Sequence, residues 1–436
     1  MRNTLYICLL LVLLSLTDLA VSQSLFLTRN IGHATVGFDI NSIYNYNLYE
    51  GHRFGGSAFL DIPVKYDNRF GSDFQKSINI SGYGAFGLAD EAWKYGGRLE
   101  FRLPRNTLRN AFLGFNHDIE IAGLHDFASY QLLNTISNSG YFSSHFSGID
   151  RLCVGFSLAL PHALLLMSEY RHSREQLLFD AFGLLYPSLY DDQKLTPSTF
   201  DELHFRLSLR PSGSATDGRA ILDVIAGNAI PHEDDASGNT FCRLVVQYER
   251  TVLLGSRGNP LSLFAQAGST LTPDMPISRR FNISGTGGSF YYFNNSLLTV
   301  RPNAFMTDIY AMLRVHFGLS KPLWTLDFSK PKPFVQASSL WGALRTGNGF
   351  GEHATYDLVT GHAINPDQMP AHETITLFAP FQGLAEFAAG IEDIVRWDYV
   401  NIGFAAAYRV TPKKALYYSD NIFGNIAVMI VARLSV

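Results

Sequence analysis

The chain has little cysteine, little charge and no long apolar run. Cysteine occurs only three times in 436 residues, which excludes the disulfide scaffold of small secreted domains. Charged residues make up 17%, against about 25% in a typical soluble domain. Net charge is −4, and no basic patch of the kind that binds nucleic acid is present. No segment after the amino terminus supplies the ~20 apolar residues of a membrane-spanning helix.

The amino terminus has the pattern of a secretory signal peptide. Arg2 precedes the apolar run 5–16, which at ~12 residues is too short to span a bilayer, and small residues at 20–22 precede Gln23. We expect cleavage after Ser22, so that residues 1–22 are the signal peptide and 23–436 the mature chain. An uncleaved anchor is the alternative.

Apolar and polar residues alternate along almost the whole mature chain. In residues 309–319, Leu313, Val315 and Phe317 share one face of a strand, and Arg314 and His316 share the other. The 33 Phe and 21 Tyr residues suit a lipid-facing band and its aromatic girdles. The pattern predicts an all-β fold: a single transmembrane antiparallel β-barrel of about 16 strands, in the bacterial outer membrane and in contact with its lipids.

Three segments do not alternate in this way. Residues 123–148 and 347–370 are predicted as extended loops, one of which could fold into the lumen. Residues 152–167 are apolar on both faces, and a turn and a kinked strand both remain open. Cys153 and Cys242 are predicted to be unbridged, with Cys242 facing lipid because it shares its face with Leu244 and Val246.

The inward face is predicted to carry charges of both signs. These side chains either line a solute path or pair across the lumen and brace the barrel, and their mixed signs favour bracing. The candidate lumen-facing charges are Arg98, Glu100, Arg102, Arg206, Arg314, His316, Glu386, Glu392, Arg409 and Arg433.

Residues 91–101, 280–317, 390–394 and 402–409 carry a family resemblance. They resemble the barrel region of a Bacteroidetes outer-membrane family, whose barrel is similar to those of the bacterial surface-antigen superfamily. That superfamily includes the outer-membrane assembly factor and the two-partner secretion transporters. The resemblance implies outer-membrane biogenesis or export, possibly beside other outer-membrane proteins or lipoproteins. The periplasmic modules usual in both groups are not expected, because alternation begins almost at once after Ser22.

The superfamily has an Arg-Gly-aromatic motif on a loop tucked inside the barrel. Arg279 and Phe281 match this motif, and Arg280 replaces its glycine. The resemblance implies that Arg279 latches onto an acidic residue of the wall. An ordinary loop with surface arginines is the alternative, because a bulky Arg lacks the backbone freedom of Gly.

Sequence motifs that would indicate catalysis or metal binding are weak. Adjacent pairs such as His117-Asp118 and His372-Glu373 would point to opposite faces of a strand, and no G-x-S-x-G motif occurs. We therefore predict no catalytic residues, cofactor or metal. Three hypotheses follow: a non-enzymatic barrel in biogenesis or export, a solute channel, and an outer-membrane lipid hydrolase.

Overall fold

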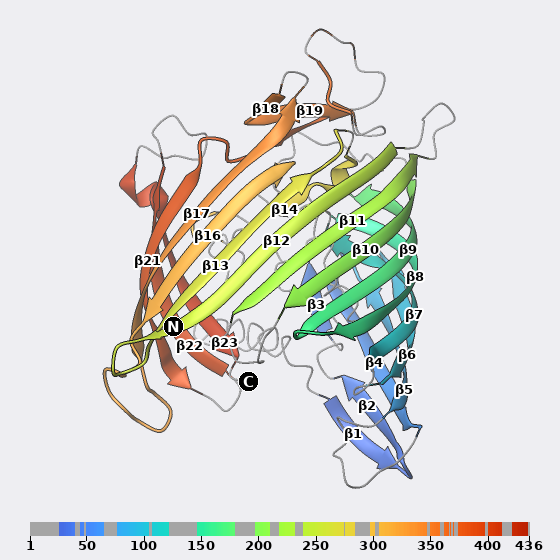
Figure 1. Ribbon diagram of the computed structural model, residues 1–436, viewed down its shortest axis with the longest axis horizontal. Helices are drawn as coiled ribbons and strands as arrows, with labels where there is room; N and C mark the ends of the chain where they lie inside the picture. The colour runs from blue at the N-terminus through green and yellow to red at the C-terminus, as the bar shows by residue number, and fades with distance from the viewer. Residues whose placement is uncertain are drawn as a thin grey trace.

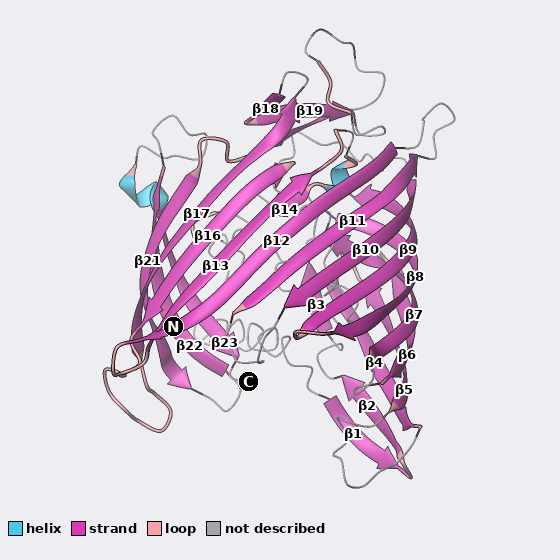
Figure 2. Ribbon diagram, in the orientation of Figure 1, coloured by secondary structure: helices cyan, strands magenta, loops and turns pink. Residues whose placement is uncertain are grey.

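The structure, a computed structural model, is almost entirely β-sheet (Figure 2). It describes residues 26–39, 44–47, 49–64, 76–103, 107–121, 146–178, 197–209, 218–231, 239–273, 275–283, 297–300, 305–346, 349–357, 362–365, 367, 369, 374–396, 400–411 and 421–434. The signal peptide expected at residues 1–22 lies outside these ranges, as does most of the segment 123–148. No helix of the described part is both long and apolar enough to cross a membrane.

One antiparallel sheet of nineteen strands forms the body of the molecule (Figure 1). Its strands are β1 (Phe26–Ile31), β2 (Ala34–Asp39), β3 (Tyr44–Asn47), β4 (Gly51–Pro63), β5 (Ser77–Gly87), β6 (Trp93–Arg102), β7 (Leu108–Ile121), β8 (Phe146–Leu160), β9 (Leu164–Leu178), β10 (Ser198–Leu209), β11 (Arg219–Pro231), β12 (Asn239–Leu254), β13 (Asn259–Thr270), β16 (Ile309–Gly318), β17 (Lys332–Thr346), β18 (Gly349–Gly351), β21 (Leu384–Arg396), β22 (Val400–Val410) and β23 (Ile426–Leu434). Two small sheets pair β14 (Phe281–Ile283) with β15 (Phe305–Thr307) and β19 (His353–Asp357) with β20 (Thr374–Phe378).

The wall strands follow one another in simple up-and-down order. β2 and β3 pair with successive parts of β4, so they act as one broken strand, whereas β1 pairs with β2 alone and β18 with the end of β17. Counted this way, the described wall has sixteen strands. The prediction of an all-β antiparallel barrel of about that size is confirmed.

The two faces of the wall differ as the alternation predicts. On β10, Leu203 and Phe205 are 46% and 40% exposed on the outside, and His204 between them is fully buried. Leu113, Val154 and Val246 on other strands are similarly exposed. An exterior in which large apolar side chains predominate, with the buried charges in the interior, is the surface that a bilayer requires, so the chain is a transmembrane β-barrel.

Connections of different length lie at the two ends of the barrel. The end that holds the connections β7–β8, β9–β10, β13–β16 and β17–β21 is called the long-loop end, and the opposite end the short-turn end. At the short-turn end, residues 161–163 link β8 to β9. His162 and Ala163 both have positive φ, and the Leu164 N–H donates to the Pro161 carbonyl, as in a type I′ turn. The segment 152–167 is thus a hairpin.

The expectation of an extended loop at residues 347–370 needs correction. Part of that segment forms β18 and β19, and β19 pairs with β20 to make a hairpin at the long-loop end. Ala354 and Tyr356 of this hairpin pack with Ile277 in a buried apolar cluster, and this burial explains why the segment is ordered. Cys153 and Cys242 are both free thiols, as predicted.

Candidate functional site

A segment between β13 and β16 lies inside the barrel, and we call its described residues, 275–283 and 297–300, the inner loop. The inner loop contains a 3-10 turn, η7 (Ile277–Arg279), and the short strand β14. Met275 and Leu297 are fully buried, and the ring of Phe281 packs edge-on against Tyr310 of β16 at 4.9 Å. Because Tyr310 shares the inward face of β16 with Arg314, the inner loop packs against the lumen side of the wall.

Arg279 is clamped between two acidic residues of the wall. Its Nη1 and Nη2 donate to the Glu175 carboxylate of β9, both at 2.6 Å, and its Nε and Nη2 donate to Glu202 of β10 at 2.6 and 3.0 Å. Nη1 also donates to Ser278 Oγ at 3.1 Å, so all five guanidinium N–H groups have acceptors. The Phe200 ring lies 3.9 Å below the guanidinium. Two bidentate pairs on a fully buried cation fix both position and orientation.

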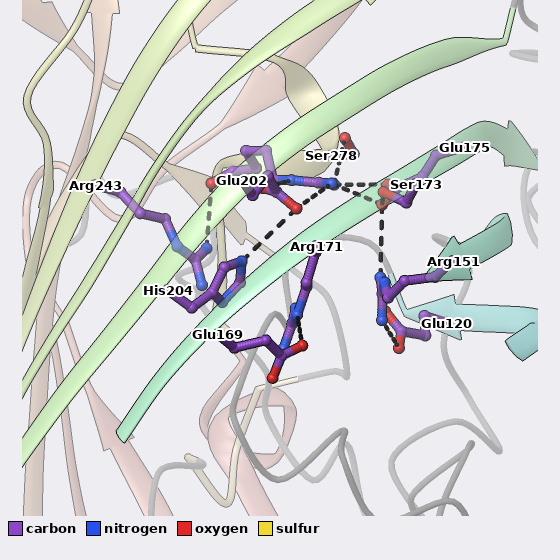
Figure 3. A network of polar contacts seen from close by, with 11 residues as sticks. Glu120, Arg151, Glu169, Arg171, Ser173, Glu175, Glu202, His204, Arg243 and Ser278 are labelled. Atoms are coloured by element: carbon purple, nitrogen blue, oxygen red, sulfur yellow. Dashed lines mark hydrogen bonds and ion pairs between the residues drawn. The ribbon is translucent and has the colours of Figure 1, made fainter. Parts of the chain in front are cut away.

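Further charges surround this clamp, from strands β7 to β12 (Figure 3). Arg151 pairs with Glu120 at 2.6 Å and approaches Glu175 at 3.5 Å, and Arg171 donates to Glu169 at 2.8 Å. Arg243 donates to the Arg279 carbonyl at 3.2 Å. Four arginines and four glutamates balance in this network, which is what burial of so many charges demands.

Arg280 anchors the inner loop on a second side. Its guanidinium pairs with the fully buried Asp308, donates to the Met275 carbonyl at 2.9 Å and lies 3.8 Å over the ring of Tyr356. Asp308 also accepts from the Arg345 backbone N–H at 2.8 Å and lies 3.0 Å from the Tyr356 hydroxyl. Burial, followed by Asp308, raises the pKa of Tyr356 against the opposing charge of Arg280, so the phenol stays a donor.

Glu386 of β21 holds the far part of the inner loop. Its carboxylate accepts the backbone N–H groups of Leu298 and Thr299 at 2.9 and 3.0 Å and the Thr299 hydroxyl at 2.9 Å. Glu386 is almost fully buried. The inner loop is therefore fastened to β9 and β10 at one point and to β21, further round the wall, at another.

The structure places nine of the ten predicted lumen charges on the inward face. Beyond Glu386, the remaining contacts join Arg98 and Arg102 to Glu100, Arg206 to Asp223, His316 to Glu392, Arg314 to the ring of Phe264, and Arg409 to Asn425. The side chain of Arg433 lies outside what the structure describes. Among the described residues, no group of three or more His, Cys, Asp or Glu side chains is placed to hold a metal ion.

No family model matches the chain, and no curated protein does. Among solved structures it is similar to BamA from Haemophilus ducreyi lacking POTRA domains 1–3, with TM-score 0.46, 8% identity, and coverage of 95% of this chain and 75% of that one. It is also similar to CdiB from Acinetobacter baumannii (TM-score 0.40, 9% identity, 88% and 57% covered) and to the copper transporter OprC (0.38, 11%, 89% and 59%). These likenesses are too weak to carry an argument about function.

Sequence reasoning missed the acidic partners of the two arginines. Glu202 lies four residues before Arg206, which the alternation places on the inward face, so counting by two would have placed Glu202 in the lumen. Glu175 has no such signal, because polar residues occupy both faces of β9 over residues 168–175. Asp308 stands two residues before Tyr310, so the same counting gives its inward side, but the counting does not give its contact with Tyr356 of the hairpin β19–β20.

Proposed function

We propose that this chain is an integral outer-membrane barrel of the surface-antigen type. In this proposal it acts without catalysis in outer-membrane biogenesis or export, as an accessory subunit beside other outer-membrane proteins or lipoproteins. The observation that carries the proposal is the clamp of Arg279 by Glu175 and Glu202. The sequence resemblance implies this kind of latch on this loop.

The pinned inner loop also supports a role other than free passage of solutes. Charges that could line a path are instead paired with each other, and inner-loop backbone groups bond to Glu386 of the wall. Hydrogen-bonded ion pairs that join different strands restrict the motion of a barrel interior. A braced interior leaves the rims and the outer surface as the parts that meet other molecules.

Depletion of the protein should lower the outer-membrane levels of other barrels, because an assembly or export subunit acts on many clients. Quantitative mass spectrometry of outer-membrane fractions measures this, with restoration by the wild-type gene as the control. Affinity purification from native membranes should also recover other barrels or lipoproteins. Unchanged barrel levels together with a lone purified protein would contradict the proposal.

A solute channel is the second candidate, favoured by lumen charges that keep some exposure, such as Arg206 and Asp223, whose side chains are 14% and 12% exposed. In planar bilayers we expect no conductance steps from the wild type and discrete steps from Glu386→Ala. The substitution removes three charge-assisted bonds, each contributing about 1.5–3 kcal/mol, and frees the segment at Leu298.

Glu392→Ala is the matched control for this experiment. Glu392 belongs to the same strand, but it pairs with His316 at 3.5 Å. This variant should remain silent in the bilayer. Conductance steps from the wild type would favour the channel, and silent Glu386→Ala insertions would show that the far part of the loop stays closed without its anchor.

A further inference from the structure

The short-turn end carries an exposed apolar cluster where a polar turn would be expected. We call this set the basal cluster, and it consists of Leu319, Leu323, Trp324, Leu326 and Phe328. Trp324 is 49% and Phe328 59% exposed. The cluster lies on the connection 319–331 between β16 and β17, which projects beyond the strands at the lower left of Figure 1, beside the connection between β12 and β13.

The connection 319–331 is an ordered element with its backbone groups bonded. Leu323 N–H donates to the Pro331 carbonyl at 2.8 Å, and Leu326 and Ser329 exchange backbone hydrogen bonds at 2.8 and 3.1 Å. Ser320 Oγ donates to the Gly258 carbonyl at 2.6 Å, which ties the two connections together. The exposed side chains are therefore held in place by the fold.

Trp324 is prepared for an apolar environment. Its indole Nε1–H donates to Ser329 Oγ inside the turn at 3.1 Å, and the ring thus needs no outside acceptor. Burying an indole whose N–H is already satisfied gains the hydrophobic free energy without leaving a donor unpaired.

The basal cluster continues the lipid-facing band of the barrel. Val252 and Val335, on the outward face of β12 and β17, are exposed immediately above it. Arg257, Lys321 and Lys330 stand on the two connections, against a single acid, Asp327. An apolar patch that joins the bilayer surface and is edged by basic side chains complements an anionic lipid interface.

We infer that the β16–β17 connection is an interfacial anchor that binds anionic phospholipid in the leaflet at the short-turn end. Trp324, Leu323 and Phe328 enter the acyl region, and Lys321 and Lys330 meet the headgroup phosphates. The inference rests on the barrel's position in a membrane and is independent of any role in biogenesis.

Depth-dependent fluorescence quenching tests the anchor. The purified full chain is reconstituted into phosphatidylethanolamine–phosphatidylglycerol vesicles whose acyl chains carry bromine near the headgroup. The emission of Trp324 is obtained by subtracting the spectrum of Trp324→Phe from that of the wild type. Trp93→Phe, which removes a tryptophan at the long-loop end, is the control. Bromine should quench Trp324 strongly and aqueous iodide weakly. Quenching by iodide alone would overturn the inference.

The charge requirement is tested in the same vesicles. Neutralising either lysine, as Lys321→Gln or Lys330→Gln, should lower the ratio of lipid-inserted to water-exposed Trp324 about fivefold, which corresponds to ~1 kcal/mol per basic residue near an anionic surface. Phosphatidylcholine vesicles should show no such change, and an equal loss in both lipids would contradict the headgroup assignment. If Trp324 were protected from iodide in native membranes but not in the vesicles, a protein would cover the turn, and this result too would overturn the inference. A heat-modifiable band verifies folding of every variant.

Discussion

Replacing Arg279 by alanine should destabilise the folded barrel by about 3–5 kcal/mol, since it leaves the buried carboxylates of Glu175 and Glu202 without their shared cation. Denaturant unfolding in detergent micelles, followed by tryptophan emission and by the heat-modifiable band, measures the loss. Arg279→Lys should recover only part of it, because one ammonium cannot make two bidentate pairs.

Arg174→Ala is the matched control for this experiment. Arg174 precedes Glu175 on β9 but is exposed on the outer face, so the change in unfolding free energy should stay within about 0.5 kcal/mol. Adding Glu175→Gln and Glu202→Gln to Arg279→Ala should restore part of the stability, because the uncompensated charges are then gone. If the triple variant were no more stable than Arg279→Ala, the clamp would not be the cause.

Asp308→Ala should cost a similar amount, about 3–5 kcal/mol, and should also detach the hairpin β19–β20. The substitution leaves the fully buried Arg280 without its carboxylate and removes the acceptor of the Arg345 N–H. Limited proteolysis should therefore cut the hairpin in Asp308→Ala under conditions in which the wild type stays intact. Unfolding in micelles gives the free-energy difference.

Tyr356→Phe separates the contribution of the Tyr356 hydroxyl from the contribution of its aromatic ring. It removes one hydroxyl near Asp308 and keeps the aromatic ring under Arg280, so it should cost only about 1 kcal/mol. Asp367→Ala, an exposed acid at the same end, should change neither stability nor cleavage. If the hairpin stayed intact in Asp308→Ala, the apolar cluster around Ile277 would hold β19 without the contacts of Asp308.

Local pattern predicted more of the wall than of the loop inside it. Leu313 and Arg314 are assigned to opposite faces correctly because adjacent residues on a strand must face opposite ways, and one of those faces is lipid. The same rule failed to anticipate β19, because its position depends on burial against Ile277, far away in the sequence.

Arg280 shows how a motif comparison can mislead about backbone. The glycine of the family motif suggested a conformation that a bulky residue would resist. In this chain Arg280 is extended, with φ −68° and ψ 158°, a region open to any residue. Its side chain, in place of the missing glycine, supplies the bond to Asp308 that ties the loop to the rim.

The all-β class, the two faces of each strand and the mixed charge of the interior could be predicted from the sequence, because the two-residue period of a strand depends on neighbouring residues alone. Which charges meet depends on the tertiary structure. Glu202 and Glu175 stand 77 and 104 residues before Arg279, and no local pattern states which strands will lie beside the inner loop. Burial within the barrel brings them together, and the cost of an unpaired buried charge keeps them there.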